Sequence, residues 1–395
     1  MRKEPSGGDA GGMEGNMQEG IFTCREVYEE GAALLEELED GRLDARLLLE
    51  YYCGIPAHRL LADPETAVKA EEREAFLAGI HRRAAREPLA YITGEQSFMG
   101  LPFVVSPDVL IPEQDTENLV EEALRHLEDG SRILDLCTGS GCILLSLLRY
   151  SNGCTGVGTD LSPEALRIAQ ENARILGLDA QTIWLQGDLF SALENASGSP
   201  ERLKKNRQGS GAVSAAADVD PADGNPPDRY PADGNLVDHN PADRDQVDEK
   251  QVYGNPTEGN PADRNPEPAE YGKVLSGSGR RNGPVLPDRF DLIISNPPYI
   301  PSAVIGTLAP EVRCAEPRLA LDGGADGLDF YRRIIAEAPD HLVIGGRLML
   351  EIGYDQGEAV AALLERAGYY GTEILQDYGG NDRVATAVRS ALRQS

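Results

Sequence analysis

Apolar residues recur at helical spacing near the beginning of the chain, after a polar, Gly-rich stretch. Thr23 and Glu26 have the spacing of a capping box, in which each residue satisfies a backbone N–H of the other. Four apolar side chains follow at helical spacing: Val27, Leu34, Leu35 and Leu38. This pattern predicts a first helix, which we expect to end at Gly41.

Two more helices are expected before Pro88. One runs from Asp44, as its cap, to Tyr52 and ends near Gly54, and another runs from about residue 65 to residue 86. The short connections predict a small helical bundle over residues 21–88. Such a bundle can add stability or hold a macromolecular substrate, and the residues favour neither. We assign it as a substrate-binding domain, preceded by a disordered tail at residues 1–20.

The pattern changes over residues 89–116. Tyr91–Gly94 and Phe98–Val105 predict two short strands around a turn. We interpret them as a hairpin that links two domains.

Short apolar runs then alternate with amphipathic stretches. A helix is expected from Glu117 to Leu127, with Asp115 or Thr116 as its cap. Buried strands are predicted at residues 132–136, 155–159, 181–186, 290–295 and 346–352, and helices at 143–148, 163–176, 330–338 and 357–367. Residues 372–376 and 383–388 complete the pattern as an antiparallel pair. Repeated βαβ units predict an α/β fold with a doubly wound, mostly parallel sheet.

Residues 195–287 interrupt this pattern. They are rich in Pro, Asp, Asn, Gly and Ser and carry a degenerate Pro-Ala-Asp repeat, as at Pro221 and Pro261. Apolar residues are too few there to offset the entropy of ordering, so we predict a disordered insertion. Because the cost of closing a loop grows only logarithmically with its length, the α/β domain can be divided into residues 117–194 and 288–395.

Composition narrows the function classes. The chain has 395 residues and a formal net charge of −29, which argues against a surface built for nucleic-acid backbones. The six cysteines are scattered without a C-x-x-C pair, which is typical of reduced thiols and makes a zinc site unexpected. The first twenty residues have no apolar run typical of a secretory signal, and no apolar run is long enough to span a membrane. We therefore expect a cytoplasmic protein without a metal.

The strand predicted at residues 290–295 ends in Asn296-Pro297-Pro298-Tyr299. Each proline lacks an N–H, so the strand stops and Asn296 lies at its carboxyl end, where open α/β sheets bind ligands. The Asn296 carboxamide, the carbonyls around Pro297 and the Tyr299 ring can hold a planar NH2 group, such as an amide or an exocyclic amine. Asn-Pro also occurs in ordinary turns, but these four residues at a strand end favour a binding site.

Three other strand ends carry candidate residues. Gly139 and Gly141 lie between a strand and a helix, where glycine lets a ligand approach the backbone, although Gly-x-Gly is weak evidence. Asp160 can accept both hydroxyls of a ribose, or cap the helix at Ser162. Asp188 can accept from an adenine amino group, or be an ordinary turn residue. Together they favour a cofactor that contains a ribose.

Combined with Asn296–Tyr299, the pattern resembles the class I S-adenosylmethionine-dependent methyltransferases and, more narrowly, the release-factor glutamine methyltransferases. The stretches that carry the narrower resemblance are 44–49, 86–94, 110–117, 135–141, 316–318, 326–328 and 380–384. The resemblance implies a seven-stranded sheet and transfer of a methyl group to the glutamine amide in the Gly-Gly-Gln loop of peptide chain release factors. In the family, Arg-Pro usually precedes Asp-Thr-Glu; here Glu113-Gln114 stand there.

The resemblance also implies residue roles. The loop Cys137, Thr138, Gly139, Ser140 and Gly141 holds the methionine part of the cofactor, Asp160 its ribose, and Asp188 with Leu189 its adenine. Asn296, adjacent to the methyl group, and the Pro297 carbonyl hold the substrate amide, Pro298 stiffens the loop, and Tyr299 packs on the amide plane.

Three alternatives remain. A ribosomal-protein glutamine methyltransferase has a similar architecture, but Asp115-Thr116-Glu117 favours the release-factor branch. An adenine methyltransferase shares the Asn296–Tyr299 motif, but the acidic composition and the lack of a basic recognition segment count against a nucleic-acid substrate. A non-enzymatic cofactor-binding protein is the third.

Overall fold

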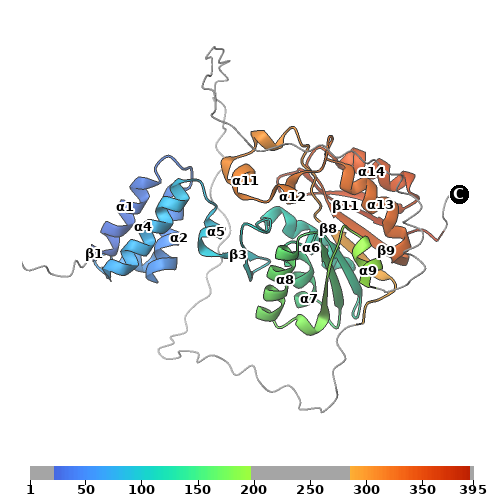
Figure 1. Ribbon diagram of the computed structural model, residues 1–395, viewed down its shortest axis with the longest axis horizontal. Helices are drawn as coiled ribbons and strands as arrows, with labels where there is room; N and C mark the ends of the chain where they lie inside the picture. Colours follow the sequence, from blue (N-terminus) through green and yellow to red (C-terminus); the bar gives the residue numbers. More distant parts are fainter. Residues whose placement is uncertain (1–21, 197–284, 392–395) are drawn as a thin grey trace, which may run out of the picture. The chain divides into compact units, whose positions relative to one another are not determined.

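The computed structural model describes residues 22–196 and 285–391. The disordered tail predicted at residues 1–20 lies outside these ranges, as does nearly all of the insertion predicted at residues 195–287. The described part of the chain contains a group of N-terminal helices and an α/β domain (Figure 1).

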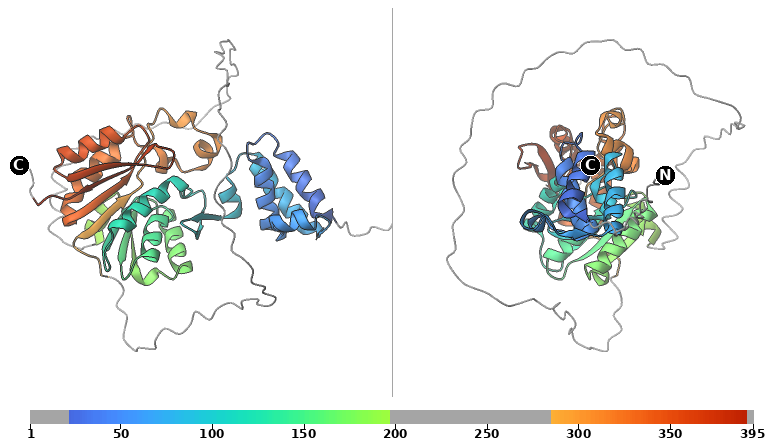
Figure 2. Two further views of the ribbon diagram at one scale, coloured as in Figure 1. Left: turned by 180° about the vertical axis from the view of Figure 1, so that it is seen from behind. Right: turned by 90° about the vertical axis from the view of Figure 1, so that its left-hand side faces the viewer.

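Helices α1 (Cys24–Leu34), α2 (Gly41–Cys53) and α4 (Ala70–Ala84) pack together around an apolar core (Figure 2). Strand β1 (Phe22–Thr23) precedes α1 and pairs antiparallel with β2 (Ala67–Val68), which follows the short helix α3 (Ala57–Ala62). The capping box predicted for α1 is confirmed: the Thr23 hydroxyl accepts from the Glu26 N–H, and the Glu26 carboxylate accepts from the Thr23 N–H.

Some helix boundaries predicted in this region are wrong. Gly41 begins α2 instead of ending α1, because a Cβ at this position would lie 2.0 Å from the carbonyl oxygen of Leu35 and only glycine permits the tight turn. Asp44 lies inside the first turn of α2 and does not cap it; its Oδ2 instead accepts from Arg83 Nε at 2.7 Å. The third predicted helix begins later than residue 65, as α4.

The linking region contains α5 (Leu89–Thr93), followed by the hairpin of β3 (Glu95–Phe98) and β4 (Leu101–Val104). The strand predicted at Tyr91–Gly94 is therefore wrong. Pro88 precedes this one-turn helix and Gly94 ends it in a left-handed conformation, so the segment is too short to show a helical period. Helix α6 (Gln114–His126) has Glu113 at its N-cap position, so the predicted caps Asp115 and Thr116 both lie within its first turn.

Within the described residues, seven strands form one sheet in the order β10-β11-β9-β8-β5-β6-β7. They are β5 (Arg132–Leu136), β6 (Thr155–Asp160), β7 (Thr182–Gln186), β8 (Phe290–Ser295), β9 (Leu342–Glu351), β10 (Tyr370–Gln376) and β11 (Asp382–Val388). Strands β5 to β9 pair in parallel, and β11 is antiparallel to both β9 and β10. The doubly wound, mostly parallel sheet predicted from the sequence is confirmed.

Helices cover both faces of this sheet (Figures 1 and 2). One face packs on α6, α7 (Cys142–Tyr150) and α8 (Pro163–Ile175), and the other on α9 (Ser191–Ala196), α13 (Asp329–His341) and α14 (Gly357–Arg366). Short segments in the connections are η1 (Asp179–Gln181), η2 (Ile305–Thr307), α11 (Pro310–Ala315) and α12 (Arg318–Leu321).

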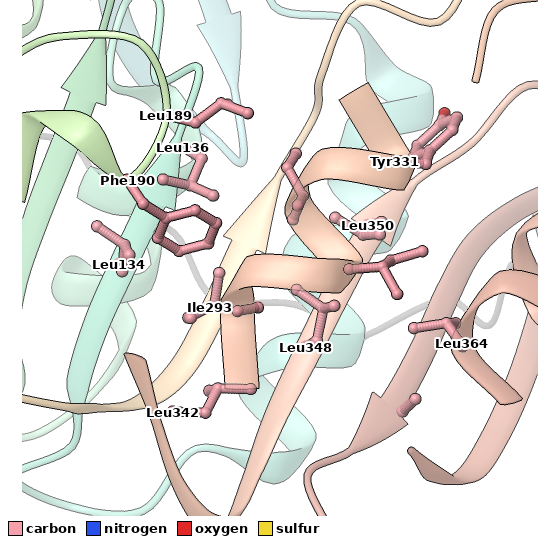
Figure 3. Close-up of a cluster of buried hydrophobic side chains, with 14 of the residues drawn as sticks. Leu134, Leu136, Leu189, Phe190, Ile293, Tyr331, Leu342, Leu348, Leu350 and Leu364 are labelled. Carbon is pink, nitrogen blue, oxygen red and sulfur yellow. The ribbon is translucent and has the colours of Figure 1, made fainter. Parts of the chain in front are cut away.

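Alternation along the central strands explains the two cores. In β8, Leu292 and Ile294 pack toward α6 and α7, whereas Ile293 packs toward α13 with Leu348 and Leu350 of β9 (Figure 3). Because neighbouring side chains of a strand point to opposite faces, a strand buried on both faces needs a continuous apolar run. Residues 292–294 provide that run.

No helix in the described part of the chain is long and apolar enough to cross a membrane.

Candidate functional site

A cavity of about 380 Å³ lies at the carboxyl ends of β5, β6, β7 and β8. Its volume is in the range of pockets that bind small molecules. The predicted site residues in its wall are Cys137, Thr138, Gly139, Ser140, Asp160, Asp188, Leu189, Asn296 and Pro298. The other predicted residues do not line the cavity, although they are close in sequence to residues that do: Gly141, Pro297 and Tyr299.

The loop after β5 turns sharply into α7. Cys137, Gly139 and Gly141 have left-handed backbone conformations, with φ of 58°, 55° and 80°. For Cys137 this conformation costs about 1–3 kcal/mol, which the surrounding fold must offset. A Cβ on Gly139 would meet no described atom within 4 Å, so this glycine leaves room for a ligand against the backbone. A Cβ on Gly141 would lie 3.1 Å from Trp184 and 3.2 Å from Ala169, so Gly141 instead permits close packing beneath the loop.

A buried carboxylate supports this loop. Asp135 of β5 is completely buried, and its Oδ2 accepts from the Thr138 hydroxyl at 2.5 Å. The pKa of Asp135 is raised to about 7, chiefly by burial. The hydrogen bond from Thr138 lowers this pKa, and the nearby charge of Asp160 raises it. The bond holds Thr138 in the wall of the cavity.

Asp160 holds the loop from the next strand end. Its Oδ2 accepts from the Gly139 N–H and its Oδ1 from the Ser162 N–H, both at 2.9 Å. The cap of α8 is Ser162 itself, whose hydroxyl accepts from the Ala165 N–H, so Asp160 is not the cap. Burial raises the pKa of Asp160, and the N–H groups of Ser162 and Gly139 lower it. Its oxygens retain lone pairs that can accept from hydroxyl groups of a ligand.

Asp188 pairs with a residue that the sequence analysis did not single out. Its Oδ2 lies 2.7 Å from Arg333 Nη2, and about half of each side chain is exposed. Arg333 and Phe330 belong to the first turns of α13, and both line the cavity. This part of the cavity wall therefore combines an ion pair with an aromatic ring.

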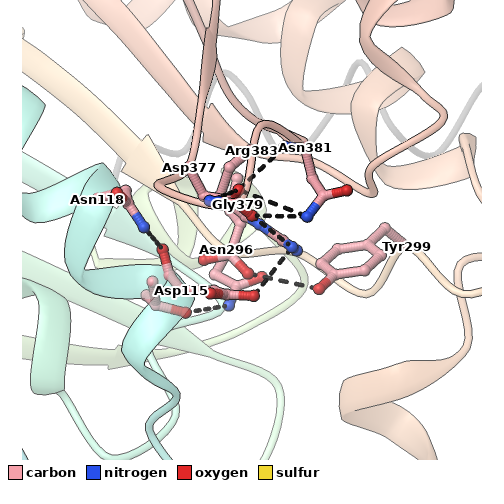
Figure 4. Close-up of polar contacts among 10 residues, drawn as sticks. Asp115, Asn118, Asn296, Tyr299, Asp377, Gly379, Asn381 and Arg383 are labelled. Atoms are coloured by element: carbon pink, nitrogen blue, oxygen red, sulfur yellow. Dashed lines mark hydrogen bonds and ion pairs between the residues drawn. The ribbon is translucent and has the colours of Figure 1, made fainter. Parts of the chain in front are cut away.

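Asn296 directly follows β8 and lines the cavity. Its Nδ2 donates to Thr116 Oγ1 at 3.2 Å (Figure 4). Thr116, in the first turn of α6, is 3% exposed and also lines the cavity. This bond joins the strand end to the beginning of a helix that is distant in sequence.

Tyr299 is anchored at both ends. Its hydroxyl donates to Glu351 Oε1 at 3.4 Å, and its carbonyl accepts from Gln356 Nε2 at 3.0 Å. Burial raises the pKa of Tyr299, so the hydroxyl keeps its proton and acts as a donor. A Cβ on Gly323 would lie 2.7 Å from Tyr299 Cα, and one on Gly327 would lie 2.3 Å from its carbonyl oxygen, so these glycines let a second loop pack against the Tyr299 backbone.

Arg383 connects α6 to the last hairpin. Its Nη2 lies 2.9 Å from Asp115 Oδ2 and 3.2 Å from Asp377 Oδ2 (Figure 4). The Asp377 carboxylate also accepts from the N–H groups of Gly379 and Asn381, so residues 377–381 form a closed turn that leads into β11. These contacts fix the beginning of α6, and with it the position of Thr116.

Sequence reasoning missed Thr116 as a site residue, together with Glu351, Arg333 and Phe330. Glu351 carried a usable signal, because it ends an apolar strand just as Asn296 does. Thr116 carried none, because its proximity to Asn296 depends on how α6 packs on the sheet. Glu113, at the position where the family usually has arginine, lines the cavity.

Two family descriptions match parts of this chain. The PrmC N-terminal domain matches residues 26–94, and a methyltransferase domain matches residues 133–201.

Full-length relatives are also similar. The release factor glutamine methyltransferase of Geobacter sulfurreducens is 34% identical over 366 residues, which cover 92% of this chain and 96% of the relative. The protein of the same description from Moorella thermoacetica is 36% identical over 355 residues, covering 89% and 93%. The solved structure of a release factor-specific protein-(glutamine-N5) methyltransferase from Alicyclobacillus acidocaldarius is 23% identical. The similarity covers 73% of this chain and 99% of that chain, with a TM-score of 0.32.

Proposed function

Because the chain belongs to the release factor glutamine methyltransferase family, we propose that it methylates the side-chain amide nitrogen of a release-factor glutamine. The proposed target is the glutamine of the Gly-Gly-Gln loop. The observation that carries the proposal is that the chain is 34% identical to such an enzyme over 92% of its length, together with Asn296 in the wall of the same cavity as Gly139.

The similarity to these relatives confirms the family, the enzyme class and the cofactor that were predicted from the sequence. The chain is an S-adenosylmethionine-dependent release factor glutamine methyltransferase. We propose further that it works in the cytoplasm and that residues 21–88 hold the release factor. In this proposal residues 89–116 link that domain to a catalytic domain made of residues 117–194 and 288–395.

The residues at the cavity fit the cofactor. Gly139 leaves open space against a backbone that Asp160 holds in place, and Asp160 has acceptor capacity left for the ribose hydroxyls. Asp188, Leu189 and Phe330 offer a polar and apolar surface for the adenine. The cofactor supplies an electrophilic methyl group when bound.

This chain's residues must then make a poor nucleophile react. The lone pair of an amide nitrogen is delocalised into its carbonyl. Acceptors directed at the two amide hydrogens draw electron density back to the nitrogen and hold its lone pair in line with the methyl group. We assign these acceptors to Asn296 Oδ1 and the Pro297 carbonyl. Tyr299, anchored through Glu351, is proposed to flank the plane of the amide.

A labelling experiment tests the substrate. The purified protein is incubated with methyl-labelled S-adenosylmethionine and, separately, with a release factor, ribosomal proteins or nucleic acid. We expect label in the release factor and none in a variant release factor whose Gly-Gly-Gln glutamine is replaced by alanine. Label in ribosomal protein or nucleic acid, with none in the release factor at saturation, would overturn the proposal.

A further inference from the structure

The proposed function requires Asn296 to present one particular side of its carboxamide. Oδ1 only accepts hydrogen bonds and Nδ2 only donates them. An amide NH2 in the substrate also donates, so a rotation of Asn296 by half a turn would set donor against donor. Some neighbouring group must therefore select the orientation.

Thr116 is the described neighbour that bonds to Asn296, and it cannot select the orientation by itself. It accepts from Asn296 Nδ2 at 3.2 Å. A hydroxyl can equally donate, and would then prefer Asn296 Oδ1. The choice depends on where the single hydroxyl proton of Thr116 is directed.

The Glu351 carboxylate can accept a hydrogen bond from the Thr116 hydroxyl. Ser295 pairs with Leu350 in the parallel register, so Asn296 and Glu351 are the next residues on neighbouring strands. Leu350 packs toward α13, so the following side chain points to the opposite face, where α6 lies. Glu351 is 1% exposed, and among the described residues its Oε2 has no geometrically well-formed hydrogen bond.

We propose that Glu351 and Thr116 are positioning residues that fix the Asn296 carboxamide with its oxygen toward the substrate amide. The Glu351 carboxylate attracts the Thr116 proton, and the Thr116 oxygen then presents only lone pairs to Asn296. Those lone pairs select Nδ2 and leave Oδ1 for the substrate. This inference rests on the proposed function, because it concerns the same amide.

The ionisation of Glu351 follows from the groups around it. Its pKa is raised to about 7, chiefly by burial, while the nearby Thr116 hydroxyl lowers it. The negative charges of Glu113 and Asp115 raise this pKa further, and the positive charge of Arg383 on β11 lowers it. The Tyr299 hydroxyl also donates to Oε1, and the Tyr331 hydroxyl donates to the Glu351 carbonyl.

The sign of the pH effect follows from this arrangement. Above its pKa, Glu351 accepts only and the orientation is set. Below it, the protonated carboxyl can donate to Thr116, which frees the Thr116 proton to donate to Asn296 Oδ1. Activity should therefore fall as the pH drops through about 7.

The test compares Thr116→Val, Thr116→Ser and Glu351→Gln, each in the full chain with S-adenosylmethionine and a release factor. Thr116→Val keeps the shape and removes the hydroxyl. We expect its kcat to fall about tenfold or more, because small misplacements of a reacting group can cost about 10² in rate. Thr116→Ser should restore most of that loss. Cofactor affinity, measured by calorimetry, should change less than about twofold in both.

Thr182→Val is the matched control. Thr182 is also buried, bonds a main-chain carbonyl, and lies at the amino end of β7, away from the cavity. It should leave kcat unchanged. Glu351→Gln, which is close in shape, should lower kcat and remove the fall in kcat/KM near pH 7, and it decides the matter if Thr116→Val does not fold.

The outcomes separate the two proposals. If the wild-type protein labels no release factor, the proposed function fails and the positioning proposal fails with it. If the wild type is active and Thr116→Val matches it, or if valine and serine reduce kcat equally, only the positioning proposal is overturned. If kcat/KM of Glu351→Gln still falls as the pH drops through about 7, the proposed role of Glu351 is contradicted.

Discussion

Replacing Asn296 by alanine should separate chemistry from folding. The side chain makes one described hydrogen bond, from Nδ2 to Thr116 Oγ1 at 3.2 Å. Loss of one neutral bond costs about 1 kcal/mol of stability, which corresponds to a fall in Tm of about 2–4 °C for a domain of this size. The loop keeps its other supports, since Pro297 and Pro298 remain and the Tyr299 carbonyl still accepts from Gln356.

The effect on catalysis should be much larger. Removing one positioned hydrogen-bonding partner of the transition state commonly costs about 10²–10³ in kcat, or about 2.7–4 kcal/mol. The Pro297 carbonyl would still hold one of the two amide hydrogens, so we expect a loss of about 10² in Asn296→Ala. The loss should appear mainly in kcat, because the acceptor matters most when the nitrogen becomes the nucleophile.

The assay is methyl transfer to a release factor under saturating cofactor, with Tm and cofactor affinity measured on the same preparation. A kcat close to that of the wild type, with normal folding, would refute the reasoning and make the Asn296–Tyr299 loop a structural turn. A collapse of Tm would also refute it, since one hydrogen bond cannot account for that.

Three further predictions concern other parts of the chain. Asp160→Ala should weaken cofactor binding in calorimetry more than it lowers kcat, because its carboxylate holds the Gly139 N–H and is assigned the ribose; equal losses would contradict this. Gly139→Ala should cost about 1–2 kcal/mol in unfolding and weaken cofactor binding at least about tenfold, since φ is 55° and the new methyl group enters the cavity; unchanged affinity would show that the ligand lies elsewhere. Asp44→Ala should cost about 2 kcal/mol by denaturant titration, because it removes a hydrogen bond between a carboxylate and a guanidinium that are only 10% and 13% exposed, while Arg83 keeps Glu311 at 3.3 Å as a second carboxylate partner; the exposed Glu29→Ala should cost much less, and equal costs would refute the distinction.

The sequence predicted what depends on local pattern. Runs such as residues 292–294 identify a strand buried on both faces, and Asn296-Pro297-Pro298 identifies where it must stop. Gly177 and Gly368 directly follow the helices predicted at residues 163–176 and 357–367, and both have the left-handed conformation that commonly ends a helix. Here local chemistry and fold agree.

The predictions failed for segments too short to show a period and for contacts between residues far apart in sequence. The five residues of α5 are too few to show a period, so Tyr91–Gly94 resembled a strand. Asp44 resembled a helix cap, but the packing of α4 against α2 gives its carboxylate to Arg83. The proximity of Asn296 to Thr116 and Glu351 depends on the β8–β9 register and on the position of α6, neither of which a single sequence specifies.

The central claim is that this chain transfers a methyl group to one amide nitrogen. Fragmentation mass spectrometry of the release factor, after incubation with the purified protein and S-adenosylmethionine, tests it most directly. We predict the mass of one methyl group on the side-chain amide of the Gly-Gly-Gln glutamine, and its appearance about 10² times more slowly when Asn296→Ala is used. An unmodified glutamine at saturating enzyme and cofactor, or a methyl group on a different residue, would contradict the account.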